Sequence, residues 1–155
     1  MKRVLCETSA ALACVLMLAG NSTAIAAEPT VVELTQVACQ FLESEQGRNH
    51  GFKSSNIKDC QAINARSATE RLATATPLKL KPGKHIFRVT NKDVPYELGF
   101  WLRPASLVKR VSLPSVSGGG LTTGKTQDYV IDLKAGEYLY SCPLNTTPDY
   151  KLVVK

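Results

Sequence analysis

Cysteines are the residues of this sequence with the clearest chemical potential, because a thiol can form a disulfide or bind a soft metal ion. The 155-residue chain contains five, and three of them, Cys39, Cys60 and Cys142, lie beyond residue 27. In an oxidising compartment an odd number leaves either one disulfide and one separate thiol, or cysteines held by a metal. A Cys39–Cys60 disulfide would close a loop of about 20 residues and stabilise the fold by about 3 kcal/mol in the chain-entropy model. The sequence leaves both alternatives open.

Motifs for other chemistries are weak. The only histidines are His50 and His85, and no serine or cysteine has a base at a recognisable spacing, so hydrolytic catalysis is not indicated. Neither H-E-x-x-H nor C-x-x-C occurs, which removes the usual sequence support for a structural zinc site.

Binding of nucleotides and nucleic acids is also not expected. Gly119 and the run 124–126 (GKT) match the phosphate-loop pattern G-x-x-x-x-G-K-[ST]. That motif requires a following helix, whereas the residues 126–133 (TQDYVIDL) alternate as a strand does. The net charge of +6 comes from scattered lysines and arginines without a basic stripe, which argues against nucleic-acid binding.

The N-terminal residues 1–27 have the features of a secretory signal peptide. Lys2 and Arg3 supply a positive start, residues 10–20 are mostly apolar, and residues 24–26 (AIA) offer a cleavage site. The apolar stretch is about half of the ~20 residues that a spanning helix needs. We therefore expect export to the periplasm, leaving residues 28–155 as one domain.

The remaining chain reads as β-strands with one insertion. With 44% hydrophobic and 21% charged residues, the composition is that of a globular protein. Alternating or β-branched runs predict strands over 30–37, 78–81, 85–90, 96–103, 107–113, 126–133, 137–142 and 150–154. The polar, alanine-rich residues 43–76 predict an insertion with one or two helical turns, since Ile57, Cys60 and Ile63 recur every three residues. Residues 117–120 (SGGG) predict a loop. This organisation indicates an antiparallel sandwich or barrel.

The C-terminal half resembles the cupredoxins. Residues 133–143 (LKAGEYLYSCP) resemble their ligand loop, and residues 83–95, ending in NKDVP, resemble the strand and turn that deliver their first copper-binding histidine. The resemblance implies an all-β fold, a cupredoxin-like antiparallel β-sandwich with a short, partly helical insertion. Blue-copper sites use two histidines, a cysteine and an axial methionine. Here Tyr96 follows Pro95 where the first histidine is expected, Asn145 takes the second position and Pro148 stands near the methionine position. Only Cys142 is retained, so an electron-transfer copper centre is not implied.

A nearer likeness is to the cupredoxin-like domain of EfeO-type periplasmic iron-uptake proteins. The matching residues are Cys39 after the first strand, Glu97 after the asparagine-containing turn, and Cys142 before the loop 145–148 (NTTP). This resemblance implies a thiolate and carboxylate site for a copper or iron ion, to which Tyr96 beside Glu97 could add an oxygen. A Cys39–Cys60 disulfide is the alternative use of Cys39.

Together these features predict a periplasmic protein that binds copper or iron for uptake, delivery or tolerance, with a periplasmic or membrane metal-uptake component as a possible partner. Two other hypotheses remain. One is a ferroxidase or electron-transfer partner of an iron-uptake system. The other is a metal-free interaction module that docks a partner through residues 115–123 or through the insertion.

Overall fold

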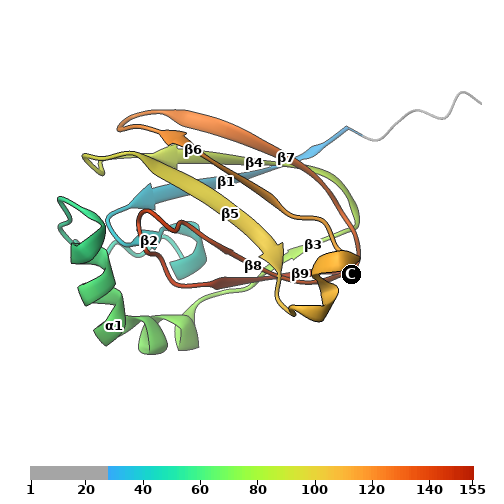
Figure 1. Ribbon diagram of the computed structural model, residues 1–155, viewed down its shortest axis with the longest axis horizontal. Helices are drawn as coiled ribbons and strands as arrows, with labels where there is room; N and C mark the ends of the chain where they lie inside the picture. The colour runs from blue at the N-terminus through green and yellow to red at the C-terminus, as the bar shows by residue number, and fades with distance from the viewer. Residues whose placement is uncertain (1–27) are drawn as a thin grey trace, which may run out of the picture.

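A computed structural model describes residues 28–155 as two β-sheets packed face to face, with one long helix at one end (Figure 1). One sheet has the strand order β2-β1-β4-β7 and the other β3-β9-β8-β5-β6. The strands are β1 (Thr30–Val37), β2 (Gln40–Phe41), β3 (Leu78–Leu80), β4 (Gly83–Asn91), β5 (Leu98–Pro104), β6 (Val116–Leu121), β7 (Thr126–Leu133), β8 (Gly136–Ser141) and β9 (Tyr150–Val154). The helical elements are η1 (Glu43–Glu45), α1 (Ile57–Thr74) and η2 (Val108–Val111). The predicted β-sandwich with a helical insertion is confirmed, while the predicted signal peptide lies outside the described residues.

Alternating side chains hold the two sheets together. In β4 every second residue from His85 to Asn91 is buried, and in β7 Tyr129, Ile131 and Leu133 are buried in the same way. Aromatic rings form the centre of the core, where Phe100 lies 5.4 Å from Phe87 between ring centroids. β4 and β7 thus each bury one face, as their period-two pattern predicts.

Two strand pairs are parallel, which differs from the purely antiparallel expectation. β1 pairs with β4 and β3 pairs with β9 in parallel register. A parallel pair requires a crossover connection. Residues 38–82, which include the insertion, form that connection between β1 and β4.

The insertion contains a longer helix than predicted. α1 has 18 residues and begins at a capping box, in which the Asn56 side chain accepts a hydrogen bond from the helix and Asp59 accepts one back. Its buried residues are Cys60, Asn64 and Arg71, so the face that meets the sandwich is largely polar. Disulfide and hydrogen bonds, more than apolar contact, therefore fix the helix in place.

The connection between β5 and β6 also differs from the sequence-based prediction. The strand predicted over 107–113 is wrong, because Val108–Val111 form the short helix η2. The loop predicted over 117–120 lies instead within β6. No helix within residues 28–155 is both long and apolar enough to cross a membrane.

Candidate functional site

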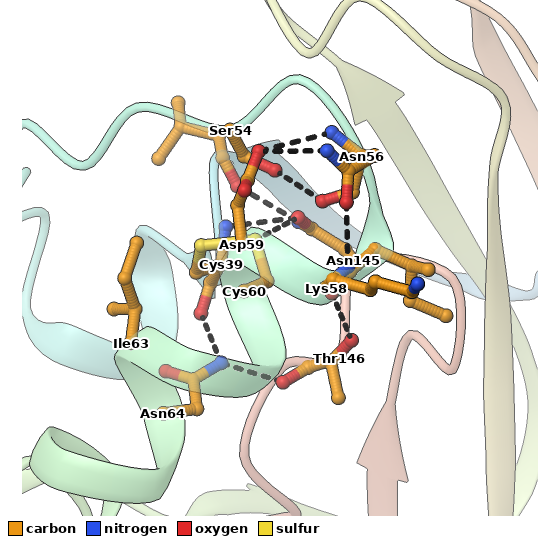
Figure 2. The surroundings of a disulfide bond; sticks show 12 residues. Cys39, Ser54, Asn56, Lys58, Asp59, Cys60, Ile63, Asn64, Asn145 and Thr146 are labelled. Carbon is orange, nitrogen blue, oxygen red and sulfur yellow. Dashed lines mark hydrogen bonds between the residues drawn. A yellow bond between two sulfur atoms is a disulfide. The ribbon is translucent and has the colours of Figure 1, made fainter.

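Three cysteines from distant parts of the chain gather around Asn145 at one end of the sandwich. The Asn145 Oδ1 accepts a 2.8 Å hydrogen bond from the Cys39 backbone N–H and lies 3.3 Å from the Cys60 Sγ (Figure 2). The Asn145 backbone N–H donates to the Cys142 Sγ at 3.2 Å. The fold therefore brings together the end of β1, the first turn of α1 and the loop after β8.

Cys39 and Cys60 form a disulfide, with their Cα atoms 5.0 Å apart. Both residues are fully buried. The Cys39 backbone is held in the left-handed region at φ 66°, and its carbonyl accepts hydrogen bonds from Asn64 and Arg71 at 3.2 and 3.1 Å. The alternative pairing considered from the sequence is thus present. While this bond is intact, Cys39 has no thiolate to offer a metal.

This disulfide yields a stability prediction. A link across 21 residues stabilises by about 3 kcal/mol in the chain-entropy model. Denaturant unfolding of the wild type should therefore show a loss of about 3 kcal/mol on reduction, and the Cys39→Ala/Cys60→Ala variant should show the same loss without a reductant. Cys142→Ser is the control, since it should keep the wild-type response to reductant. Equal stability with and without reductant would contradict the prediction.

Cys142 is the one free cysteine of the described residues and is fully buried. Its Sγ accepts hydrogen bonds from the Gly99 and Asn145 backbone N–H groups at 3.3 and 3.2 Å. Burial raises the pKa of the Cys142 thiol, and the hydrogen bonds to the sulfur offset this rise only in part. The group is therefore a protonated thiol at neutral pH, and a metal would have to displace its proton.

The two oxygen donors predicted beside Cys142 make other contacts. Glu97 is exposed, and its Oε1 accepts a hydrogen bond from the Gly120 N–H in β6 at 2.8 Å. The Tyr96 hydroxyl lies 2.6 Å from the Ser54 Oγ and 3.7 Å from the Cys60 Sγ, and burial raises its pKa. Across residues 28–155, no three His, Cys, Asp or Glu side chains are grouped so that they could hold a metal ion.

Gln36 is a site residue that the sequence analysis missed. It is fully buried, its Nε2 donates to the Gly99 carbonyl at 2.8 Å, and its Oε1 lies 3.4 Å from the Asn145 Nδ2. That Nδ2 also donates to the Val37 carbonyl at 2.8 Å. We call the side chains of Gln36 and Asn145 the amide plug. The sequence does contain a signal for it. Val32, Leu34 and Gln36 alternate along β1 and point to the same side, so Gln36 is a polar residue on an otherwise apolar face.

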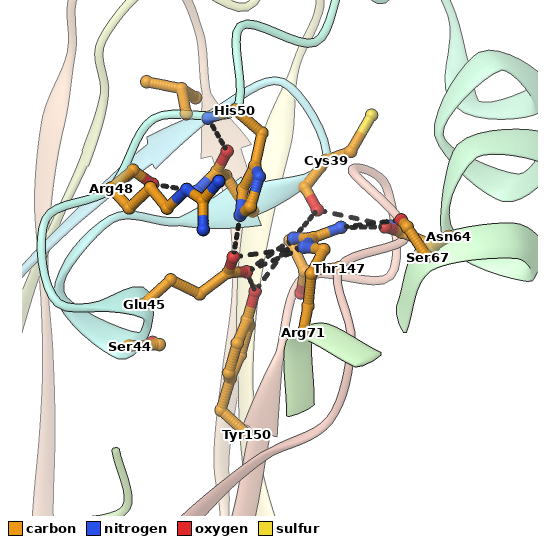
Figure 3. A network of polar contacts seen from close by, with 12 residues as sticks. Cys39, Ser44, Glu45, Arg48, His50, Asn64, Ser67, Arg71, Thr147 and Tyr150 are labelled. Atoms are coloured by element: carbon orange, nitrogen blue, oxygen red, sulfur yellow. Dashed lines mark hydrogen bonds and ion pairs between the residues drawn. The ribbon is translucent and has the colours of Figure 1, made fainter. Parts of the chain in front are cut away.

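A second buried polar network joins the insertion to the sandwich (Figure 3). The Glu45 carboxylate accepts hydrogen bonds from Arg71 at 2.6 Å and from the Tyr150 hydroxyl at 2.5 Å, and it lies 2.6 Å from the His50 Nε2. Glu45, Arg71 and Tyr150 are all buried. Burial alone would raise the pKa of Glu45, but the bonds from Arg71, Tyr150 and His50 outweigh it and lower the pKa. A charged Glu45 thus holds η1, α1 and β9 together.

Comparison with known proteins shows the fold. Auracyanin B superposes with a TM-score of 0.51 at 11% identity, covering 84% of this chain and 93% of the other. The fold is cupredoxin-like. Lac15 from a marine microbial metagenome aligns at 14% identity with a TM-score of 0.41, covering 96% of this chain and 32% of Lac15. A multi-copper oxidase from Pediococcus acidilactici aligns at 10% identity with a TM-score of 0.38, covering 99% and 30%. No family model matches the sequence, and a search of curated proteins gives no match. Particular closeness to EfeO-type domains stays a prediction.

The described residues of this cupredoxin-like chain do not fit a copper or iron ion as they are arranged. Cys39 is oxidised, and Glu97 bonds to β6 at the surface. No buried side-chain nitrogen or oxygen of residues 28–155 lacks a hydrogen-bond partner, so no buried polar atom is left waiting for a ligand.

Proposed function

We propose that this chain is an exported cupredoxin-like module that acts by binding a partner, without a resident metal. The observation that carries the proposal is the amide plug. Asn145 stands where the resemblance places the second histidine ligand, and its side chain bonds to the Cys39 N–H and the Val37 carbonyl.

The energetics of the amide plug favour this proposal. If Asn145 turned toward an ion, it would leave the Cys39 N–H buried without a partner, at about 1–3 kcal/mol, and the Val37 carbonyl would lose one of its hydrogen bonds. The protonated Cys142 thiol adds the further cost of losing its proton. A bound ion would have to overcome both, and a single thiolate with neutral amides is a poor ligand set for doing so.

Export to the periplasm belongs to the same proposal. The signal features of residues 1–27 and the Cys39–Cys60 disulfide both suit an oxidising compartment. A periplasmic or membrane component is then the expected class of partner.

A second candidate function is binding of copper or iron through Cys142 for uptake, delivery or tolerance. It is favoured by the position of Cys142 in the loop after β8 and by the two backbone hydrogen bonds that its sulfur accepts. Glu97 and Tyr96 would have to turn inward to contribute, and Cys39 could join only after reduction of the disulfide. A ferroxidase or electron-transfer role needs the same ion, and catalysed loss of Fe(II) under air would reveal it.

Metal content of the natively purified protein tests the choice. We expect native mass spectrometry to find no stoichiometric copper or iron, and to find the wild type and Cys142→Ser equal after incubation with Cu(I) or Fe(II) and desalting. One ion per wild-type chain that is lost in Cys142→Ser would overturn the proposal in favour of the second candidate. The same spectra give the mass of the protein, which is lower by two hydrogen atoms when the disulfide is formed, and so verify that the oxidised form was tested.

A further inference from the structure

The connection between β5 and β6 carries an exposed apolar cluster. The side chains of Leu107, Val108 and Val111 are 71%, 79% and 96% exposed. They are the most exposed large hydrophobic residues of the described chain, since the next, Val130, is 51% exposed. We call residues 107–111 the η2 tip. None of the residues of η2 is buried, so the tip contributes nothing to the core.

Basic residues are interleaved with these apolar side chains. Lys109 and Arg110 lie between Val108 and Val111, and both are exposed. The segment that leads into the tip is fixed to β8, because the Ala105 N–H donates to the Glu137 carbonyl at 2.9 Å. The tip thus presents aliphatic and cationic side chains together to the solvent.

The same end of the sandwich carries further positive charge. The β7–β8 turn, the β3–β4 turn and the C-terminus lie at the same end of the sandwich as η2 (Figure 1), since the register pairs Gly83 with Leu133 and Gly136 with Val154. The exposed basic residues of this end are Lys81, Lys84, Lys109, Arg110, Lys134 and Lys155. The acidic side chains are Glu28, Asp132, which lies opposite Lys84 in the β4–β7 register, and Glu137, which lines a pocket together with Lys109. This end therefore carries six basic side chains and three acidic ones.

We propose that the η2 tip docks on an anionic phospholipid surface. Aliphatic side chains gain by leaving water for the boundary between headgroups and acyl chains, while lysine and arginine beside them reach lipid phosphates. The tip has both kinds of group exposed on one short segment, as that boundary requires. The inference rests on the proposed function because it names the partner of a binding module.

Sedimentation with lipid vesicles tests the inference on the full chain. Vesicles of phosphatidylcholine are compared with vesicles that also contain phosphatidylglycerol. We expect binding that depends on phosphatidylglycerol and weakens with salt. The Lys109→Gln/Arg110→Gln variant should bind about 30-fold more weakly, from two lost cationic contacts. The Leu107→Ser/Val108→Ser/Val111→Ser variant should lose a similar or larger factor.

Matched controls make the outcome decisive. Val31→Ser/Val130→Ser removes two exposed valines that flank Ile86 on the other sheet, and it should bind as the wild type does. A leader still attached to the chain adds equally to every variant and cancels in the ratios. No binding to phosphatidylglycerol vesicles, or equal binding by the tip variants, would overturn the inference. So would tip-dependent binding to polyglutamate without binding to vesicles, which would point to an acidic protein. Metal content is measured separately, so the lipid inference and the metal-free proposal can fail independently.

Discussion

Replacing Asn145 with alanine is expected to lower the free energy of unfolding by about 3 kcal/mol. The side chain is fully buried and bonds to the Cys39 N–H and the Val37 carbonyl, both at 2.8 Å. Alanine would leave the Cys39 N–H buried without a partner and would remove one hydrogen bond of the Val37 carbonyl. It would also leave a small cavity beside Gln36. Denaturant unfolding with the disulfide intact measures the effect.

Asn49→Ala is the matched control for this substitution. Asn49 is exposed, and its side chain accepts one local hydrogen bond from the Gly51 N–H. Its removal should cost less than about 1 kcal/mol. A loss at Asn145 as small as that of the control would show that the amide plug is not a stabilising element, and the energetic case against a metal at this end would fall with it.

The Arg71→Met variant is expected to lose about 3–5 kcal/mol at neutral pH, because it leaves the buried Glu45 carboxylate without its cation. Arg71 also donates to the Cys39 carbonyl and bonds to Asn64, so α1 should loosen with it. The Glu45→Gln/Arg71→Met double variant removes both charges and should recover part of the loss. Unfolding of the four proteins in a double-mutant cycle measures the coupling; additive effects would contradict it.

The same ion pair predicts how stability depends on pH. The pKa of Glu45 is lower in the folded protein than its ordinary value of 4.5. The stabilisation is therefore fully present above pH 4.5 and is lost as the pH falls toward and through the lower folded pKa. The wild type should lose stability in this window more steeply than Glu45→Gln. Asp59 and Asp128 also have lowered pKa values, but both proteins contain them, so their contributions to the pH dependence cancel in the comparison.

The strands could be predicted where a local pattern decides the structure. The structure of residues 107–113 could not be predicted in this way, because a run of apolar residues forms a strand only where a partner strand is available. Both edges of β5 are taken by β6 and β8, so the segment that joins β5 to β6 cannot pair alongside β5. It turns into η2 instead.

Close packing explains why the glycine-rich segment is a strand. A Cβ atom on Gly99 would lie 2.5 Å from the Gly118 carbonyl oxygen, so β5 and β6 approach each other only because glycine stands there. Composition predicts a loop over 117–120, whereas the tertiary contact selects an edge strand.

The candidate site was predictable only in part. The Cys39–Cys60 disulfide was one of two alternatives that the cysteine count left open, and Asn145 stood out at a position where histidine was expected. The partners of Glu45 could not be predicted from the sequence, because Arg71 is 26 residues away and Tyr150 is 105 residues away. Contacts of that separation depend on the completed topology and leave no local trace.

The disulfide and the amide plug have a consequence for the life of this protein in its compartment. A sandwich end that is closed by a covalent bond and by amides can mature without waiting for an ion to arrive. Scarcity of copper or iron should then leave it intact, whereas a shift toward a more reducing environment should release α1. We therefore expect the stability of the protein to depend on the redox state of its disulfide and not on the supply of copper or iron.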